Sequence, residues 1–258
     1  IDNHFKLCAG PGAGKTTFLI QHIRRILHQS DRLSRAKKIA CITYTNTGVE
    51  TIRSRLKEIA DNVEVTTIHS FLYNHIVKPY LWILDDVNFP LDKLDGHDEI
   101  KPGYQLLREY KQQSGQQWIN DDQQLSIALS KLTWTLNNQG NLELKLLKPF
   151  YGKIGKTNIR KASYIIFKKI CWNKGLMSHD DVLYFSYLII KKSEEVKDII
   201  RAKFPYFLID EFQDTNPIQG IITKLIAERE TIVGVIGDPC QSIFSFQGTD
   251  ENIFNQFF

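Results

Sequence analysis

Three short segments of the chain carry residues whose types and spacing suit phosphate chemistry. The first, AGPGAGKTT (residues 9–17), follows an apolar run and precedes a helical pattern. Glycines in such a loop let successive backbone N–H groups turn toward one anion, assisted by the positive end of the helix. Lys15 can then reach β- and γ-phosphates, and the Thr16 hydroxyl can complete a Mg²⁺ shell. The alternative is an ordinary glycine-rich turn, but the strand–loop–helix context favours a phosphate-binding loop.

The residues expected to surround the phosphates share this one loop. They are Ala9, Gly10, Pro11, Gly12, Ala13, Gly14, Lys15, Thr16 and Thr17.

The second segment is YFLIDEFQDT (residues 206–215), in which four apolar residues precede Asp210 and Glu211. A buried strand would deliver both carboxylates to its C-terminal end, where ligand sites of α/β proteins lie. Asp210 would hold Mg²⁺ through water, and Glu211 would polarise an attacking water. An isolated Asp-Glu pair can be a solvated turn, but the phosphate-binding loop makes that alternative the weaker one.

The third segment, VIGDPCQSI (residues 235–243), ends another apolar run in the same way. Gln241 would touch the γ-phosphate or the attacking water and report whether the phosphate is present. Alone, this segment would be interpreted as a turn, because Gly-Asp-Pro is common in turns.

Short apolar strands and amphipathic helices alternate on both sides of a long central segment. This rhythm predicts an α/β fold with a parallel sheet and helices on both faces. The expected strands are residues 5–9, 38–44, 63–68, 206–211 and 231–238.

The β-α rhythm stops near Pro79 and resumes after about residue 175. The segment between them has turn-rich loops and helical stretches, such as residues 121–138, with no convincing strand series. We therefore expect one discontinuous α/β domain (residues 1–78 and 176–258) interrupted by a mostly helical inserted domain (residues 79–175).

The inserted segment contains a basic stretch, residues 144–174, that has no Asp or Glu. Its basic residues alternate with aromatic residues. Such a stretch could bind single-stranded nucleic acid by neutralising phosphate charge and stacking on bases. A solvated basic face over an aromatic core explains the stretch equally well. Its basic residues are Lys145, Lys148, Lys153, Lys156, Arg160, Lys161, Lys168, Lys169 and Lys174, and its aromatic residues are Phe150, Tyr151, Tyr164, Phe167 and Trp172.

The composition indicates a soluble globular chain of 258 residues, 42% hydrophobic and 24% charged. A net charge of +4 is too small to indicate a polyanionic partner by itself. No apolar run approaches the roughly 18 residues of a membrane helix, and the first residues lack a signal-peptide pattern. The four cysteines are scattered without metal-like spacing. We expect a cytoplasmic protein with reduced thiols, no membrane association and no metal bound by His or Cys.

The three phosphate-chemistry segments, in their order along the chain, resemble the motifs of the superfamily 1A DNA helicases of the UvrD/Rep/PcrA type. The resemblance covers nearly the whole chain. It is carried by CITYTNTGVETIRSRL (41–56, motif Ia), TTIHSF (66–71), DEFQDTNPIQ (210–219, motif II), GDPCQSIFSFQG (237–248, motif III) and MSHDDVLYFSYLII (177–190, the helix that returns from the inserted domain).

This resemblance implies a RecA-like P-loop domain that uses ATP and Mg²⁺ and acts on single-stranded and forked DNA. The implied activity is ATP-driven translocation on single-stranded DNA, 3′→5′ as in the relatives, with duplex unwinding. An alternative is a nucleotide-gated DNA-binding or sensor subunit of a nuclease or defence complex, without unwinding. A nuclease or a repair or defence protein is the partner that either role suggests.

The resemblance also assigns residues to DNA. Tyr44 and Phe246 match aromatic residues that stack on bases, with Phe244 close by. The polar positions used on or near the phosphate backbone are matched by Thr45, Asn46, Thr67 and His69. The family's inserted domain also contacts DNA, which favours the nucleic-acid interpretation of the basic stretch.

Two departures from the family pattern qualify these expectations. Gln247 stands where the family favours Arg after the motif III aromatic residue. The second RecA-like domain, which supplies arginines to the γ-phosphate, and the adenine-reading glutamine motif have no counterpart in the sequence, so the chain matches the N-terminal half of a helicase. Alone, it is expected to be monomeric, to bind Mg-ATP weakly and to hydrolyse it very slowly.

Overall fold

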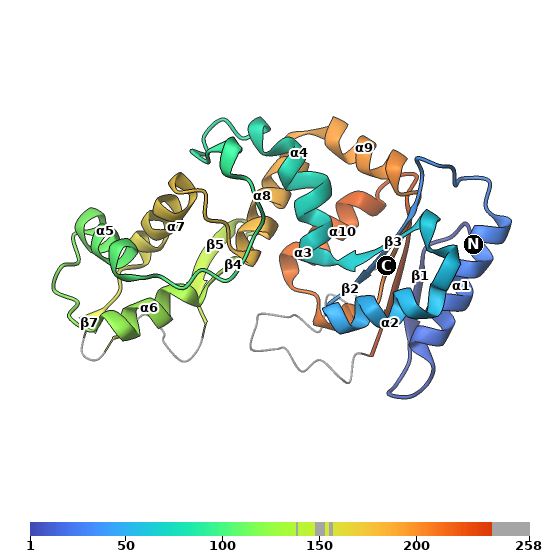
Figure 1. Ribbon diagram of the computed structural model, residues 1–258, viewed down its shortest axis with the longest axis horizontal. Coiled ribbons are helices and arrows are strands. Elements are labelled where there is room, and N and C mark those ends of the chain that lie inside the picture. The colour runs from blue at the N-terminus through green and yellow to red at the C-terminus, as the bar shows by residue number, and fades with distance from the viewer. Residues whose placement is uncertain (138, 148–152, 155–156, 239–258) are drawn as a thin grey trace. The chain divides into compact units, whose positions relative to one another are not determined.

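The computed structural model describes residues 1–137, 139–147, 153–154 and 157–238, and these form two compact units (Figure 1). The first unit comprises Ile1–Ile76 and the chain from Ile190 onward, and the second comprises Val77–Ile189. The return to the first unit falls inside helix α8 (His179–Lys192), later than the residue 176 expected from the sequence. Early α8 belongs with the inserted unit because Trp134 donates a hydrogen bond to Asp181 at 3.0 Å.

The first unit is built on a parallel five-stranded sheet of order β1-β9-β8-β2-β3. Its strands are β1 (Phe5–Cys8), β2 (Ile39–Thr43), β3 (Val63–Thr67), β8 (Tyr206–Ile209) and β9 (Ile232–Gly237). Every residue of the three central strands is buried, as continuous apolar runs predict for parallel strands covered on both faces. The expected α/β fold is thus confirmed.

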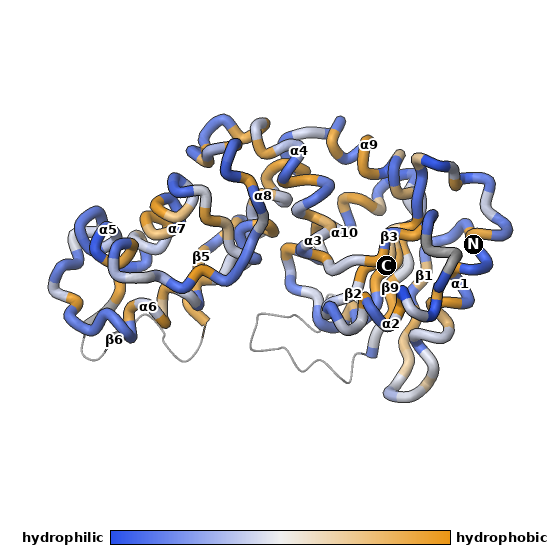
Figure 2. The backbone as a smooth tube through the Cα atoms, viewed as in Figure 1, coloured by the Kyte–Doolittle hydropathy of each residue, from blue (hydrophilic) through white to orange (hydrophobic). Residues whose placement is uncertain are grey.

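Side chains alternate between the two faces of this sheet, and each face has its own helices. Leu208 of β8 packs in a buried cluster with residues of α1 and α2, including Leu19 and Ile52. The next residue along, Phe207, points the other way, and its ring lies 5.1 Å from that of Phe71 in α3. Figure 2 shows the hydrophobic residues gathered along β2 and β9. The longer helices of this unit are α1 (Lys15–Gln29), α2 (Asn46–Leu56), α3 (Ile68–Leu72), α9 (Glu194–Lys203) and α10 (Pro217–Ala227).

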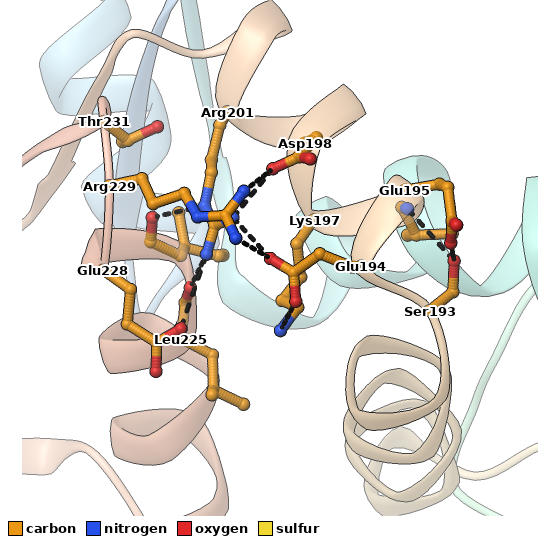
Figure 3. A network of polar contacts seen from close by, with 12 residues as sticks. Ser193, Glu194, Glu195, Lys197, Asp198, Arg201, Leu225, Glu228, Arg229 and Thr231 are labelled. Carbon is orange, nitrogen blue, oxygen red and sulfur yellow. Dashed lines mark hydrogen bonds and ion pairs between the residues drawn. The ribbon is translucent and has the colours of Figure 1, made fainter.

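Arg201 of α9 fixes the C-terminal end of α10 (Figure 3). Its guanidinium is buried and donates to the carbonyl oxygens of Leu225 and Ile226, at 2.6 and 3.3 Å. It also pairs with Glu194 and Asp198, both at 2.9 Å. Because free carbonyls end every helix, a buried arginine that satisfies two of them orders the last turn of α10.

The second unit combines helices with two small antiparallel sheets. Its longer helices are α5 (Tyr104–Ser114), α6 (Asp122–Ser130), α7 (Tyr164–Asn173) and the start of α8, and its strand pairs are β4 (Leu132–Leu136) with β5 (Leu142–Leu146) and β6 (Lys153–Ile154) with β7 (Thr157–Asn158). Short helical segments of the two units are η1 (Lys57–Asn62), η2 (Tyr73–Val77), α4 (Lys78–Tyr80), η3 (Leu81–Ile83), η4 (Leu91–Lys93), η5 (Lys161–Ser163) and η6 (Phe212–Asp214).

The helical interpretation of residues 121–138 was wrong in its second half. The helix ends at Ser130, and Leu132–Leu136 forms a strand paired with β5. The sequence LTWTL alternates with period two and contains β-branched threonines, both of which favour a strand. Its antiparallel partner follows after five residues, so the hairpin outweighs the helical pattern.

The described part of the basic stretch combines buried aromatic rings with exposed basic side chains, whereas Lys168 is buried. Tyr164, Phe167 and Trp172 are buried, so base stacking by these three rings is contradicted. Lys168 is only 2% exposed, and its ammonium lies 2.9 Å from the buried Asp181 carboxylate. For these residues the aromatic-core interpretation holds. Lys148, Phe150, Tyr151 and Lys156 lie outside the described residues.

Three cysteines fall within the described residues, and Cys8, Cys41 and Cys171 are free thiols. Among the helices described, none has the length and apolar character needed to cross a bilayer. Nor do the described residues contain three or more His, Cys, Asp or Glu side chains arranged to hold a metal ion.

Candidate nucleotide-binding site

The glycine-rich loop joins the end of β1 to the start of α1, as the sequence predicts. Gly12 and Gly14 have φ angles of 70° and 86°, which side chains other than glycine rarely adopt. Gly14 is the N-cap of α1, and its carbonyl accepts the first helical bond from the Phe18 N–H at 2.9 Å. No acidic residue lies in the first turn of α1, so no carboxylate of that turn competes with a bound anion for the helix N-terminus.

Lys15 folds back over this loop. Its ammonium donates to the Ala9 carbonyl at 3.2 Å, and its side chain is half-buried. The contact holds one positive charge directly beside the loop, where an incoming phosphate would meet it.

The Asp-Glu pair follows β8 directly. The Asp210 N–H donates to the Ile42 carbonyl at 2.8 Å, which extends the pairing of β8 with β2 by one residue. Glu211 then adopts a left-handed conformation with φ 54° and ψ 39°. Asp210 is 4% exposed, whereas Glu211 lines the same cavity as the glycine-rich loop.

The carboxylates after β8 crowd one another. Burial, and next the charge of Glu211, raise the pKa of Asp210 to about 6, although Lys15 acts in the opposite direction. Burial and Glu211 likewise raise the pKa of Asp214 to about 6. A buried carboxyl that resists ionisation suits a cation-binding position, because a divalent cation would remove that penalty.

A cavity of about 370 Å³ brings the two motifs together. Its lining residues come from the loop, from α1, from α2 and from the turn after β8: Gly10, Pro11, Gly12, Gly14, Lys15, Thr16, Thr17, Arg55 and Glu211. Ala9 and Ala13 belong to the same loop but do not line the cavity, and Asp210 lies beside Glu211 in the chain.

Arg55 lines this cavity although it was not predicted as a site residue. It belongs to the last turn of α2, and its carbonyl accepts a hydrogen bond from Arg24 of α1 at 3.1 Å. The basic pair Arg53 and Arg55 in motif Ia was a signal, but the two cannot be told apart by sequence. In the structure Arg53 donates to the Val65 carbonyl, at 2.6 Å, whereas Arg55 lines the cavity.

Gln213 is a second residue that the sequence analysis missed. Its amide nitrogen donates to Glu211 Oε2 at 2.7 Å, and its amide oxygen accepts from the Asp238 N–H at 2.9 Å. It therefore connects the turn after β8 to the end of β9. Only the observed pairing of these two strands reveals that contact.

The residues that the resemblance assigned to DNA lie at the same edge of the sheet, after β2 and β3. Tyr44 is half-buried, and its hydroxyl donates to Gln219 Oε1 at 2.7 Å. Thr45 and Thr67 are the N-caps of α2 and α3, and their side chains accept from the N–H groups of Gly48 and Ser70.

The other residues assigned to DNA either lie in α2 and α3 or fall outside the described residues. Asn46 is exposed at the start of α2, and His69 is half-buried in α3. Gln241, Phe244, Phe246 and Gln247 lie outside the described residues. The structure thus brings together the residues of the glycine-rich loop and the Asp-Glu pair, whereas the motif III residues from Gln241 onward are not described.

The glycine-rich loop, the buried strand ends and the parallel sheet together define a P-loop nucleotide-binding α/β domain. The family model for the UvrD/REP helicase N-terminal domain matches residues 1–258, and the chain belongs to this family. The resemblance inferred from the motifs is confirmed.

Curated relatives give the same result. The chain is 27% identical to the ATP-dependent DNA helicase srs2 of Schizosaccharomyces pombe over 97% of this chain and 29% of that protein. It is 27% identical to the ATP-dependent DNA helicase Rep of Escherichia coli over 93% of this chain and 34% of Rep. It is 26% identical to the ATP-dependent DNA helicase PcrA of Bacillus subtilis, over 96% of this chain and 32% of PcrA. The chain therefore spans about a third of the length of these relatives.

Proposed function

We propose that this chain is the ATP-binding part of a DNA helicase that couples ATP hydrolysis to 3′→5′ translocation on single-stranded DNA and to unwinding. The observation that carries the proposal is the cavity shared by Lys15, Thr16 and Glu211. It supports phosphate binding and hydrolysis in one place. The names of the relatives support DNA as the substrate and ATP as the nucleotide.

Each residue of the cavity has a separate task in this proposal. The N–H groups of the loop and the Lys15 ammonium hold the β- and γ-phosphates, and Glu211 accepts a proton from the attacking water. Thr16 and Asp210 would hold Mg²⁺, which when bound neutralises charge developing on the phosphates. Most of its other ligands would be water and phosphate oxygens, so no cluster of protein ligands is needed. Gln241 would contact the γ-phosphate.

DNA binding is proposed beside the nucleotide site, at the ends of β2 and β3 and in the segment that follows β9. Tyr44 and Phe246, with Phe244 beside them, would stack on bases, and each stack contributes roughly 1–3 kcal/mol without sequence preference. Thr45, Asn46, Thr67 and His69 would lie near the phosphate backbone. Among the described residues, the sheet order supports two adjacent sites, because the nucleotide residues follow β1 and β8 while Tyr44, Thr45, Asn46, Thr67 and His69 follow β2 and β3.

A strand-separation assay on the whole protein tests this function. Three fluorescently labelled substrates are compared: a fork, a duplex with a 3′ tail and a duplex with a 5′ tail. We expect ATP-dependent separation of the fork and the 3′-tailed duplex, and none by a Lys15→Ala variant. ATP-dependent DNA binding without separation would overturn the proposal and indicate a sensor subunit. Separation of the 5′-tailed duplex alone would overturn the direction.

A further inference from the structure

The Gln213 side chain is a buried amide between the ends of two neighbouring strands. It is 5% exposed and lies in η6, the short turn that follows β8. Its amide nitrogen is 2.7 Å from Glu211 Oε2, and its amide oxygen is 2.9 Å from the Asp238 nitrogen. The two segments that it joins are 25 positions apart in the chain.

The chemistry of these partners fixes the orientation of the amide. The Asp238 backbone N–H can only donate, so the amide oxygen of Gln213 must face it. The NH₂ group must then face Glu211, whose Oε2 accepts from it. Rotating the amide by 180° would oppose two donors at Asp238 and two acceptors at Glu211, so a single arrangement is allowed.

Glu211 needs such a restraint because its backbone conformation is rare. A left-handed conformation outside glycine costs roughly 1 kcal/mol or more and persists only where its surroundings enforce it. The carboxylate also lines an open cavity, where a free glutamate side chain would sample several rotamers. The hydrogen bond from Gln213 holds one carboxylate oxygen and leaves the other available to the cavity.

We propose that Gln213 is a positioning residue for hydrolysis: it orients the Glu211 carboxylate toward the cavity and ties it to the end of β9. This inference rests on the proposed function of Glu211 as the base. Gln213 is not among the residues that line the cavity, so its proposed effect is exerted through Glu211. A small displacement of a catalytic group can lower a rate by about 100-fold, which sets the scale of the expected effect.

The test measures ATP hydrolysis and nucleotide affinity separately, in the whole protein saturated with single-stranded DNA. Gln213→Leu keeps a similar volume and removes both hydrogen bonds. We expect kcat to fall about 10- to 100-fold, while the Kd of a fluorescent ATP analogue changes less than about threefold. Gln112→Leu, at an exposed glutamine of α5, is the matched control and should leave both values unchanged.

Gln213→Glu separates the two contacts. It can still accept from the Asp238 N–H, but it places a second carboxylate against Glu211. We expect the same loss of kcat in the folded variant, with folding checked by circular dichroism, so this variant decides the matter if Gln213→Leu fails to fold. A kcat within about twofold of the wild type in Gln213→Glu would overturn the proposal.

Glu211→Gln, measured beside them, keeps this inference separate from the proposed function. If Glu211→Gln retains hydrolysis, the proposed base is wrong and the role of Gln213 falls with it. If Glu211→Gln loses hydrolysis while Gln213→Glu and Gln213→Leu keep it, only the positioning role is overturned.

Discussion

At the scale of single residues, the cavity holds two positive side chains from different helices. Lys15 begins α1, whereas Arg55 reaches the cavity from the last turn of α2. A guanidinium can form two parallel hydrogen bonds to a phosphate, whereas an ammonium acts as a point charge. In the proposed site, Arg55 would therefore add directional recognition of a phosphate beside Lys15.

Replacing Arg55 by alanine should weaken nucleotide binding. The lost interaction is a charge-assisted hydrogen bond at a partly solvated site, so we expect about a tenfold rise in the Kd of a fluorescent ATP analogue. Arg25→Ala, on the exposed face of α1, is the matched control and should bind as the wild type does. Equal affinities of Arg55→Ala and wild type would show that Arg55 does not contact the nucleotide.

Residues such as Arg55 and Gln213 mark the limit of sequence reasoning. Lys15, Asp210 and Glu211 could be predicted because each stands at a fixed offset from a strand or a glycine-rich loop. Gln213 could not, because its role depends on the end of β9 lying beside the turn after β8. The burial of Lys168 was also hidden, since its partner Asp181 lies in another helix.

At the scale of elements, α10 begins with a capping box that also holds the loop after β2. Gln219 Oε1 accepts from the Asn216 N–H at 3.0 Å and from the Tyr44 hydroxyl at 2.7 Å. Gln219 is buried, so both bonds are shielded from water. The Gln219 side chain therefore links the first turn of α10 to the proposed DNA-contacting tyrosine.

A double-mutant cycle should detect this coupling. Tyr44→Phe removes one hydrogen bond and should lower the free energy of unfolding by about 0.5–1.5 kcal/mol. Gln219→Leu also breaks the capping box and should cost more. The double variant should lose less than the sum of the two, by roughly 0.5–1 kcal/mol, in urea denaturation. Strict additivity would contradict the coupling, and Tyr104→Phe, at an exposed tyrosine, should have no effect.

Two histidines join a loop of the inserted unit to the start of α8. The Nδ1 atoms of His97 and His179 lie 2.6 Å apart, and the adjacent Asp98 N–H donates to the Met177 carbonyl at 3.0 Å. Burial, and next His179, lower the pKa of His97, while Asp98 acts in the opposite direction. A histidine pair at this distance requires one ring nitrogen without a proton, so the contact exists only while at least one ring is neutral.

This contact should weaken in acid. Because the folded-state pKa of His97 is lowered, the unfolded loop binds protons first as pH falls below about 6.5, and the folded contact loses stability below that pH. Hydrogen exchange of residues 94–102, corrected for the intrinsic rate, should show less protection at pH 5.5 than at pH 7.5. His97→Asn should have low protection at both pH values. Equal protection of the wild type at both would contradict this account.

The elements themselves were predictable to different degrees. Continuous apolar runs such as those of β2 and β8 specify buried parallel strands, and both were predicted. The strand β4 was missed because LTWTL follows a helix without a strong break, and only its pairing with β5 determines the outcome. The local sequence pattern was sufficient to predict strands that are apolar on both faces. It was insufficient to predict the hairpin of β4 and β5.

At the scale of the whole molecule, one edge of the sheet serves two proposed ligands. Among the described residues, the proposed nucleotide residues follow β1 and β8, and the proposed DNA residues follow β2 and β3. Neighbouring strands lie about 4.8 Å apart, so a displacement at the nucleotide residues would reach the proposed DNA residues across only a few strands. Gln213 and Gln219 are the side chains that bridge adjacent segments along it. In the proposed function, hydrolysis and DNA contact would therefore be connected through one sheet.

The role of Glu211 as the base for ATP hydrolysis is the part of the proposed function on which the other roles depend. The deciding measurement is DNA-stimulated phosphate release by the whole protein carrying Glu211→Gln, with binding of a fluorescent ATP analogue measured in parallel. We predict that phosphate release falls by about 100-fold or more while nucleotide binding stays within about threefold of the wild type. Undiminished phosphate release by Glu211→Gln would contradict the central claim.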